Sequence, residues 1–228
     1  MFPFFFDWTF ILILPAFAFA MWAQSKVKGT YARYSQVPAR LHLTGRDVAR
    51  RILDSNGLND IEVEPIAGQL TDHYHPKQRK IRLSEGIYGS NSLAALAVAA
   101  HETGHALQHQ AGYSPMTIRA TLVPVANIGS SAAFPLFFVG LIFPAFSWLM
   151  DLGIIFFAGA VLFHLVTLPV EFDASARAVK ILGNGSLLAP DEVAGAKKVL
   201  DAAAWTYVAA AAMALLQLVR LLLLRGRD

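Results

Sequence analysis

The sequence contains no cysteine, which excludes disulfide bonds and every metal site built on thiolate ligands. It is also poor in charge, because Asp, Glu, Lys and Arg make up only 15% of its 228 residues, against about 25% in an average soluble domain. Hydrophobic residues reach 55%. Any metal site in this chain must therefore use His, Asp or Glu, and the composition is typical of a membrane protein.

The Lys and Arg residues are unevenly distributed along the chain. Eleven of the 19 lie between Lys26 and Arg82, together with six Asp and Glu residues. No run of basic residues in this stretch is longer than two, so the pattern does not favour nucleic acid as a partner. A solvated cytoplasmic segment explains it better, since positive charge collects on the cytoplasmic side of membrane proteins.

Four apolar segments approach or reach the roughly 20 residues that a helix needs to cross a bilayer. No Lys or Arg precedes the first of them, whereas Lys26 and Lys28 follow it, which favours a retained anchor over a cleaved signal peptide. We therefore predict a multi-pass α-helical membrane protein with about four transmembrane helices and the lipid bilayer as a partner. The segments lie at 8–23, 122–143, 152–168 and 202–219.

The positive-inside rule orders the chain into five parts. A transmembrane anchor is expected at 1–24 and a transmembrane hairpin at 117–170, which places the polar segments 25–116 and 171–201 on the same, cytoplasmic side. Residues 202–228 would form the last transmembrane helix and a tail. A site can therefore be assembled from two polar segments that are far apart in the sequence.

Local signals predict an α+β arrangement within 25–116. Thr44 followed by Asp47 is typical of a helix N-cap, and this helix should end at Asn56 and Gly57. Alternating and β-branched residues predict three short strands, the first ending at Pro65. The expected strands are 61–64, 70–74 and 80–83, followed by a longer helix at 91–110 with Gly112 beyond its end.

His101, Glu102 and His105 form an HExxH motif on that longer helix. Residues four apart share a helix face, so both imidazoles can bind one zinc ion, and Glu102 is placed to act as a general base. A catalytic zinc site usually has three protein ligands. His109 lies about 12 Å along the helix axis from His101, which makes it a flanking or outer group rather than the third ligand.

Glu171 is the better candidate for the third ligand. It follows the third apolar segment, returns to the same side of the membrane as the HExxH motif, and is expected to begin a new helix after Pro169. Asp173 is the second candidate. The plainer alternative is that Glu171 is an acidic residue at a membrane boundary with no metal to bind.

Residues 99–109, 70–74 and 167–172 together resemble the bacterial membrane-bound neutral zinc metallopeptidases of the YugP-like family, and the resemblance covers about 44–207. It implies a zincin-like, zinc-dependent peptidase of the bacterial cytoplasmic membrane with a cytoplasmic site. The family tends to have Asp where this chain has His75. That departure leaves the role of this strand open.

The layout is more distantly similar to the HtpX and CAAX-prenyl endopeptidases. Those enzymes pair HExxH with a downstream Glu-x-x-Ala-Asp, and this chain matches it at Glu171 and Ala174 but has Ser175 in place of the final Asp. That Asp orients a ligand histidine in the relatives. Ser175 or Asp173 are the residues that could substitute for it here.

The leading hypothesis is a membrane-embedded zinc endopeptidase that acts on peptides or membrane-associated proteins, with a role in membrane-protein quality control. In such a fold the strand 70–74 would be an edge strand beside the zinc, where a peptide can add as a further strand. His73 or Tyr74 could then stabilise the oxyanion. The alternative for both residues is that they only pack or cap the strand. The sequence does not indicate an oligomeric state.

The sequence leaves two alternatives to this hypothesis. A non-catalytic metal-binding membrane scaffold derived from a peptidase is compatible with the changes at His75 and Ser175, although an intact Glu102 argues against it. An intramembrane protease would need HExxH within a spanning helix. The apolar run before the motif, 93–100, has only eight residues and is too short to span a bilayer.

Overall fold

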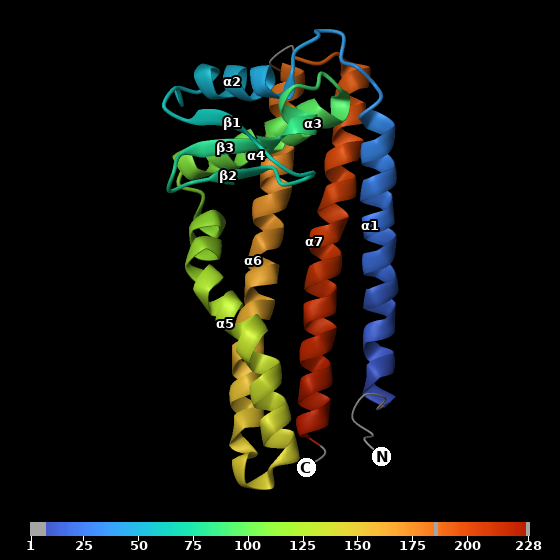
Figure 1. The fold of residues 1–228 in the computed structure, drawn as a ribbon, viewed down its shortest axis with the longest axis vertical. Coiled ribbons are helices and arrows are strands. Elements are labelled where there is room, and N and C mark those ends of the chain that lie inside the picture. Colours follow the sequence, from blue (N-terminus) through green and yellow to red (C-terminus); the bar gives the residue numbers. More distant parts are fainter. Residues whose placement is uncertain (1–7, 185–186, 227–228) are drawn as a thin grey trace. The chain divides into compact units, whose positions relative to one another are not determined.

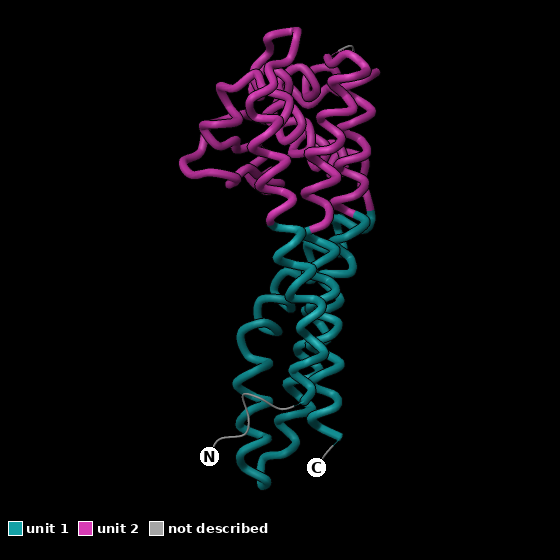
Figure 2. The backbone as a smooth tube through the Cα atoms, turned by 90° about the vertical axis from the view of Figure 1, so that its right-hand side faces the viewer, with its two compact units in different colours: residues 1–24, 114–169, 206–228 teal, residues 25–113, 170–205 magenta. Residues whose placement is uncertain are grey.

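The computed structural model describes residues 8–184 and 187–226, which divide into two compact units (Figure 2). The first unit comprises the described residues up to Gln24, those of Ser114–Pro169 and those from Thr206 onward. The second comprises Ser25–Tyr113 and the described residues of Val170–Trp205. The HExxH motif and Glu171 both belong to the second unit.

Within the described residues, four stretches of helix are long and apolar enough to cross a membrane, as the sequence predicted (Figure 1). Only 11–28% of the residues in their most apolar windows are buried inside the protein. Most of this apolar surface therefore needs cover from outside the chain, which a bilayer provides. The four stretches are Trp8–Tyr34, Ser114–Ile142, Trp148–Asn184 and Pro190–Arg225.

These helices are longer than the apolar segments from which they were predicted. The expectation that a new helix begins at Glu171 was wrong, because α6 (Trp148–Asn184) runs without interruption through Pro169. Proline removes one backbone hydrogen bond, and in membrane helices neighbouring groups commonly make good that loss. The other three are α1 (Leu14–Tyr34), which follows the short helix η2 (Trp8–Ile13), α5 (Ser114–Ile142) and α7 (Pro190–Arg225).

The first unit has an apolar core formed by α5, α6 and α7, and the short helix η3 (Pro144–Phe146) joins α5 to α6. Phe137 and Met150 are completely buried there, and the rings of Phe134 and Phe157 meet edge to face. The Arg225 guanidinium, at the end of α7, donates to the Asp151 carboxylate near the start of α6 at 2.8 Å.

The second unit contains α2 (Gly45–Ser55), and its N-terminus is capped as the sequence predicted. The Thr44 hydroxyl accepts a hydrogen bond from the Asp47 N–H (3.2 Å), and the Asp47 carboxylate accepts one from the Thr44 N–H (3.0 Å). The Thr44 hydroxyl also donates to the Asp47 carboxylate at 2.7 Å, and this bond, together with the one from the Thr44 N–H, holds the pKa of Asp47 below its usual range. At the other end, Gly57 has a left-handed conformation (φ 72°) that a side chain would disfavour.

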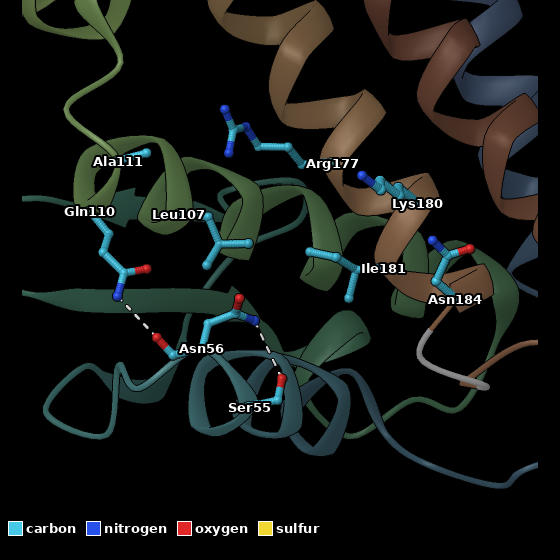
Figure 3. Close-up of a pocket in the computed structure, with 9 residues that line it drawn as sticks. All are labelled: Ser55, Asn56, Leu107, Gln110, Ala111, Arg177, Lys180, Ile181 and Asn184. Carbon is cyan, nitrogen blue, oxygen red and sulfur yellow. Dashed lines mark hydrogen bonds between the residues drawn. The ribbon is translucent and has the colours of Figure 1, made fainter.

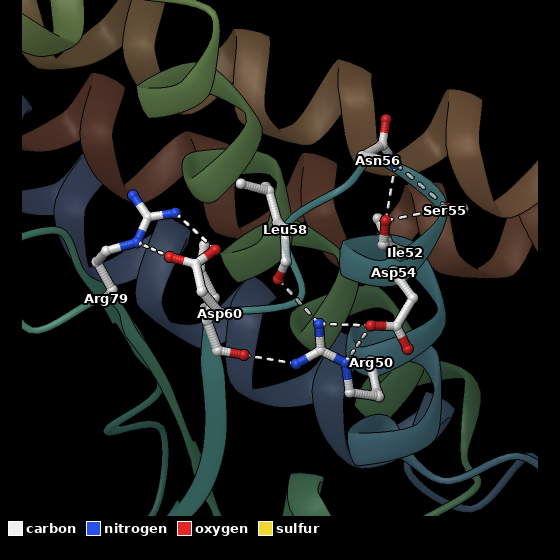
Figure 4. Close-up of polar contacts among 9 residues, drawn as sticks. Arg50, Ile52, Asp54, Ser55, Asn56, Leu58, Asp60 and Arg79 are labelled. Carbon is white, nitrogen blue, oxygen red and sulfur yellow. Dashed lines mark hydrogen bonds and ion pairs between the residues drawn. The ribbon is translucent and has the colours of Figure 1, made fainter.

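The Arg50 side chain links α2 to residues 58–61, the loop that follows this helix (Figure 4). Its guanidinium donates to the Asp54 carboxylate at 2.8 Å and to the main-chain oxygens of Leu58 and Ile61 at 2.9 and 2.5 Å. Hydrogen bonds to a charged group are stronger than neutral ones. The loop between α2 and the first strand is therefore held in one conformation.

Three short strands form a sheet in the order β1-β3-β2: β1 (Glu62–Ile66), β2 (His73–His75) and β3 (Lys80–Ser84). β1 pairs with β3 in parallel, and β2 pairs with β3 as an antiparallel hairpin. The first strand does not stop at Pro65 as expected, because β1 is an edge strand, where a missing N–H costs little. The second is shorter than the expected 70–74, since Leu70 has a positive φ of 55°.

The HExxH helix is α4 (Leu93–Gln110), which follows the single-turn helix α3 (Glu85–Tyr88). Ser92 caps it by accepting a hydrogen bond from the Ala95 N–H at 3.2 Å, close to the predicted start. The helix packs against α2, where Val48, Ile52 and Leu53 are buried. Of its 18 residues, only four are not buried, so both flanks of the HExxH motif are enclosed by protein.

Candidate metal centre

Two helices bring together three candidate ligands, namely His101 and His105 of α4 and Glu171 of α6. Glu171 lies 66 positions after His105 in the sequence. One nitrogen from each histidine and one carboxylate oxygen all lie within 4.8 Å of one another. Oε2 of Glu171 is 3.2 Å from Nε2 of His101 and 3.5 Å from Nε2 of His105. Glu171 is only 3% exposed. These are the three residues that the sequence proposed as ligands.

The spacing of the Glu171 oxygen from the two histidine nitrogens fits a zinc ion. Zinc bonds to His nitrogen and carboxylate oxygen are about 2.0–2.2 Å long and tetrahedral, which places two ligand atoms roughly 3.3 Å apart. The two measured separations, 3.2 and 3.5 Å, lie on either side of that value. Two imidazoles and one carboxylate are also the donor set of a common class of catalytic zinc site, which leaves a fourth position open.

Both histidines are oriented by a hydrogen bond at their other ring nitrogen. Nδ1 of His101 lies 3.1 Å from the Ser175 hydroxyl, and Nδ1 of His105 lies 3.0 Å from Oε1 of Gln108. The Gln108 oxygen can only accept, so His105 must carry its proton on Nδ1, which leaves the lone pair of Nε2 available for a metal ion. Of the two residues proposed to replace the missing Asp, Ser175 is the one that contacts His101.

A chain of polar groups fixes Gln108 in turn. Its amide Nε2 donates to the main-chain oxygen of Val170 at 2.7 Å and to Asp173 at 2.8 Å, while the Arg177 guanidinium donates to the same Asp173 carboxylate at 2.6 Å. These bonds decide which end of the amide faces His105. Asp173 therefore acts on the metal centre through Gln108, and the geometry does not place it among the three candidate ligands.

Sequence reasoning missed Gln108. The signal that could have found it is its spacing, since a residue three positions after His105 lies on the same face of the helix. The pattern would be an amide three positions after the second histidine, here Gln108, with an acidic residue shortly after Glu171, here Asp173, to bond it.

We expect Gln108→Leu to weaken zinc binding by about 10- to 100-fold, the usual effect of losing an outer hydrogen-bond partner. Leucine keeps a comparable volume but leaves Nδ1 of His105 without its acceptor. The measurement is a competition titration of zinc against a chromophoric chelator, on the full chain in detergent. Gln110→Leu, a nearby exposed position on the same helix, is the matched control and should change affinity little. Equal affinities for Gln108→Leu and wild type would contradict this role.

Glu102 is held next to the metal candidates by the edge of the sheet. Its side chain is buried, and Oε2 accepts a hydrogen bond of 3.0 Å from the main-chain N–H of Tyr74 in β2. This bond fixes the direction of the carboxylate. A carboxylate adjacent in sequence to a ligand histidine, and held in one direction, is placed to accept a proton.

The electrostatics of the site favour positive charge. Burial alone would lower the pKa of His105, but its hydrogen bond with Glu171 and the nearby charges of Glu102 and Glu171 outweigh burial and raise that pKa above its usual value. Two buried carboxylates around two imidazoles thus attract a cation, whether a proton or a metal ion.

His73, Tyr74 and His109 are placed as follows. Tyr74 is buried, its N–H is given to Glu102, and its hydroxyl lies 2.8 Å from Nδ1 of His109. His109 lies outside the group of three candidate ligands, as its distance along the helix predicted. The ring of His73 makes a 2.8 Å contact with the main-chain oxygen of Thr71. A role of His73 or Tyr74 in oxyanion stabilisation stays a prediction.

Gly104, inside the HExxH motif, allows α4 and α6 to approach closely. A Cβ atom at this position would lie 2.6 Å from the main-chain oxygen of Ala174. Since backbone atoms cannot yield as a flexible side chain can, any side chain here would push the helices apart. The approach brings Glu171 and Ser175 to the histidines, so this glycine sets the dimensions of the site.

A cavity of about 620 Å³ lies beside a different part of α4 (Figure 3). It is separate from the three candidate ligands, none of which lines it, although Arg177 belongs both to its wall and to the polar chain around Asp173. Gln110 closes part of it by donating to the main-chain oxygen of Asn56 at 2.9 Å. Its lining residues are Ser55, Asn56, Leu107, Gln110, Ala111, Arg177, Lys180, Ile181 and Asn184.

Comparisons with known proteins agree with this geometry. A protein-family model described as "Putative neutral zinc metallopeptidase" matches residues 9–226. A relative from Bacillus subtilis (strain 168), named "Putative membrane protease YugP", is 48% identical over 219 residues, which cover 95% of this chain and 97% of the relative. No solved structure gives a significant match. Together with the four membrane-capable helices, the relative indicates a membrane protein.

Proposed function

The chain belongs to this family of neutral zinc metallopeptidases, and from that premise we propose that it is a zinc-dependent endopeptidase of the bacterial cytoplasmic membrane. His101, His105 and Glu171 would hold the zinc ion. The observation that carries the proposal is the convergence of their three donor atoms within 4.8 Å, with each histidine oriented through its Nδ1. Bound there, zinc would polarise the scissile carbonyl and lower the pKa of a water molecule.

Glu102 performs the proton transfers in this proposal. Its carboxylate accepts a proton from the attacking water and then gives it to the leaving amine, so one group serves both halves of the reaction. The Tyr74 N–H, 3.0 Å from Oε2, keeps the carboxylate in place during both steps. His73 or Tyr74 would donate to the developing oxyanion.

β2 offers a binding edge for an extended peptide. It is an outer strand of the sheet, and since the Tyr74 N–H on its outer side is already given to Glu102, a substrate would use the other main-chain groups along this edge. A substrate strand added at this edge would be recognised through main-chain hydrogen bonds, which suits broad sequence specificity. Peptides or membrane-associated proteins are the substrate class that follows.

The orientation and role of the enzyme are inferred from charge and setting. The excess of Lys and Arg between Lys26 and Arg82 favours a cytoplasmic active site. A protease at that membrane face with broad specificity suits the removal of damaged membrane proteins. Quality control is therefore the proposed role.

Removing the metal ion tests the proposal. We expect the purified full chain in detergent to cleave an unfolded protein such as casein. Chelation should lower the rate by at least about 100-fold, because a bound metal supplies several kcal/mol of transition-state stabilisation. Zinc should restore the rate, and magnesium should not, since it prefers oxygen ligands. Cleavage that continues unchanged in the thoroughly chelated protein would contradict a zinc-dependent reaction.

A further inference from the structure

A second cavity, of about 500 Å³, lies between α1 and α7 within the second unit. It shares no residue with the metal centre, and the peptidase chemistry does not use it. The wall includes three basic side chains from two helices that are distant in the sequence. Its lining residues are Lys26, Gly29, Thr30, Arg33 and Tyr34 of α1 and Lys198, Asp201 and Trp205 of α7.

The lining of this cavity is positively charged. Among the described lining residues, Lys26, Arg33 and Lys198 are cations, while Asp201 is the one carboxylate. That carboxylate is already engaged, since the ammonium of Lys197 donates to it at 2.6 Å. Asp201 therefore offsets little of the positive charge, and the cavity is suited to a ligand with negative charge.

The cavity lies at the level where both helices change from uncharged to charged sequence. Lys26 is the first charged residue after the stretch 8–25, and Asp201 is the last before the stretch 202–219; neither stretch contains Asp, Glu, Lys or Arg. Both stretches belong to membrane-capable helices. Residues at such a transition lie at the level of the lipid headgroups.

An aromatic residue supports the same placement. Trp205 is one turn inside the uncharged part of α7 and 40% exposed, and exposed tryptophan is enriched at the membrane interface. On the other wall, the Arg33 guanidinium lies 5.7 Å from the centroid of the Tyr34 ring, which restricts the arginine without consuming its hydrogen-bond donors. The cavity thus combines fixed cationic donors with an interfacial aromatic side chain.

We propose that this cavity binds the phosphate group of an anionic phospholipid. Basic pockets between membrane helices on the cytoplasmic side bind such headgroups, and the position of this cavity at the end of two apolar stretches favours a lipid over free phosphate. Lys26, Arg33 and Lys198 bind the phosphate. This inference is independent of the peptidase activity.

The test is lipid retention by the full chain, measured by native mass spectrometry in detergent with phosphatidylglycerol or phosphatidylcholine added. The wild-type protein should retain phosphatidylglycerol in preference to phosphatidylcholine. One basic side chain near an anionic lipid surface strengthens binding about fivefold, so Lys26→Gln with Lys198→Gln should weaken that preference about 25-fold. The control variant, Lys28→Gln with Lys180→Gln, removes the same amount of charge from side chains outside this cavity. It should change the preference for phosphatidylglycerol by less than about threefold.

A variant without a charge change gives a second check. Gly29 lines the cavity, and a Cβ atom there would meet no heavy atom within 4 Å. Gly29→Leu therefore places a side chain in open space and favours the helix, yet it should reduce retention of phosphatidylglycerol by filling the site.

Three outcomes would overturn the proposal. Wild type could retain the two lipids equally, or the control pair could lose as much preference as the cavity pair, which would indicate general charge attraction. Inorganic phosphate could also displace the lipid at similar concentrations, in which case the cavity is a site for free phosphate.

Discussion

Replacing Glu102 with glutamine is expected to abolish peptide cleavage while the protein keeps its zinc and its fold. Loss of a general base typically costs 10²- to 10⁴-fold in rate, and Glu102 is proposed to serve in two proton transfers. We therefore expect at least about a 1,000-fold loss in kcat for casein or a fluorogenic peptide. The quantities to measure are the cleavage rate and the zinc content of the same preparation.

Glutamine is the appropriate substitution because of the Tyr74 contact. Its amide oxygen can still accept the hydrogen bond that Oε2 of Glu102 receives from the Tyr74 N–H, so the buried side chain keeps its partner. What changes is proton affinity, since an amide does not accept a proton near neutral pH. Glu85→Gln, at an exposed position at the start of α3, makes the same chemical change away from the site and should cleave at the wild-type rate.

The result separates the candidate functions. Lost cleavage with retained zinc supports a hydrolytic role for Glu102, whereas cleavage at the wild-type rate would contradict it. If neither the wild type nor the variant cleaves any substrate and both bind zinc, the metal-binding scaffold becomes the better explanation.

The three ligand candidates could be predicted because the signals for them are short and local. His101 and His105 are four residues apart on one helix, and Glu171 follows an apolar segment that returns to the same side. Of the groups that orient them, Ser175 could be proposed only because the resemblance marks its position. Its contact with His101 joins α6 to α4, and a contact between distant segments leaves no periodic pattern in a single sequence. Gln108 lies on the same helix as His105, but its role depends on the bonds from its amide to α6.

Gly104 shows the same limit at the level of packing. In the sequence it occupies a variable position of the HExxH motif and carries no chemistry of its own. Its importance appears only where Ala174 of α6 comes within 2.6 Å of the space that a Cβ would fill. The distance between two helices is set by tertiary packing, which local propensity does not encode.

Among the ends of helices and strands, those fixed by local contacts could also be predicted, and those that depend on tertiary packing could not. The Thr44 cap of α2 was predictable because both partners, Thr44 and Asp47, lie within one helical turn. The ends assigned at Pro65 and Pro169 were wrong, because proline is a breaker only where its missing N–H is needed. An edge strand and a packed membrane helix each remove that need, and neither circumstance is visible in the residues around the proline.

Replacing Glu171 with alanine is expected to remove most of the bound zinc. Two imidazoles on one helix then remain, whereas a catalytic zinc site usually needs three protein ligands. The loss should exceed the roughly 10- to 100-fold effect of an outer partner such as Gln108, so little zinc should remain after dialysis against a weak chelator. Elemental analysis of the detergent-purified full chain provides the measurement.

Asp173→Asn is the matched comparison, since Asp173 was the second candidate for the ligand. In the structure its carboxylate bonds Gln108 and Arg177, so this variant should show at most the smaller loss of an outer partner. Glu171→Gln, which keeps the side-chain volume, distinguishes lost coordination from a collapsed fold. Zinc retained in both Glu171 variants and lost in Asp173→Asn would show that the third ligand is Asp173, and the convergence of Glu171 on the two histidines would then not be the metal site.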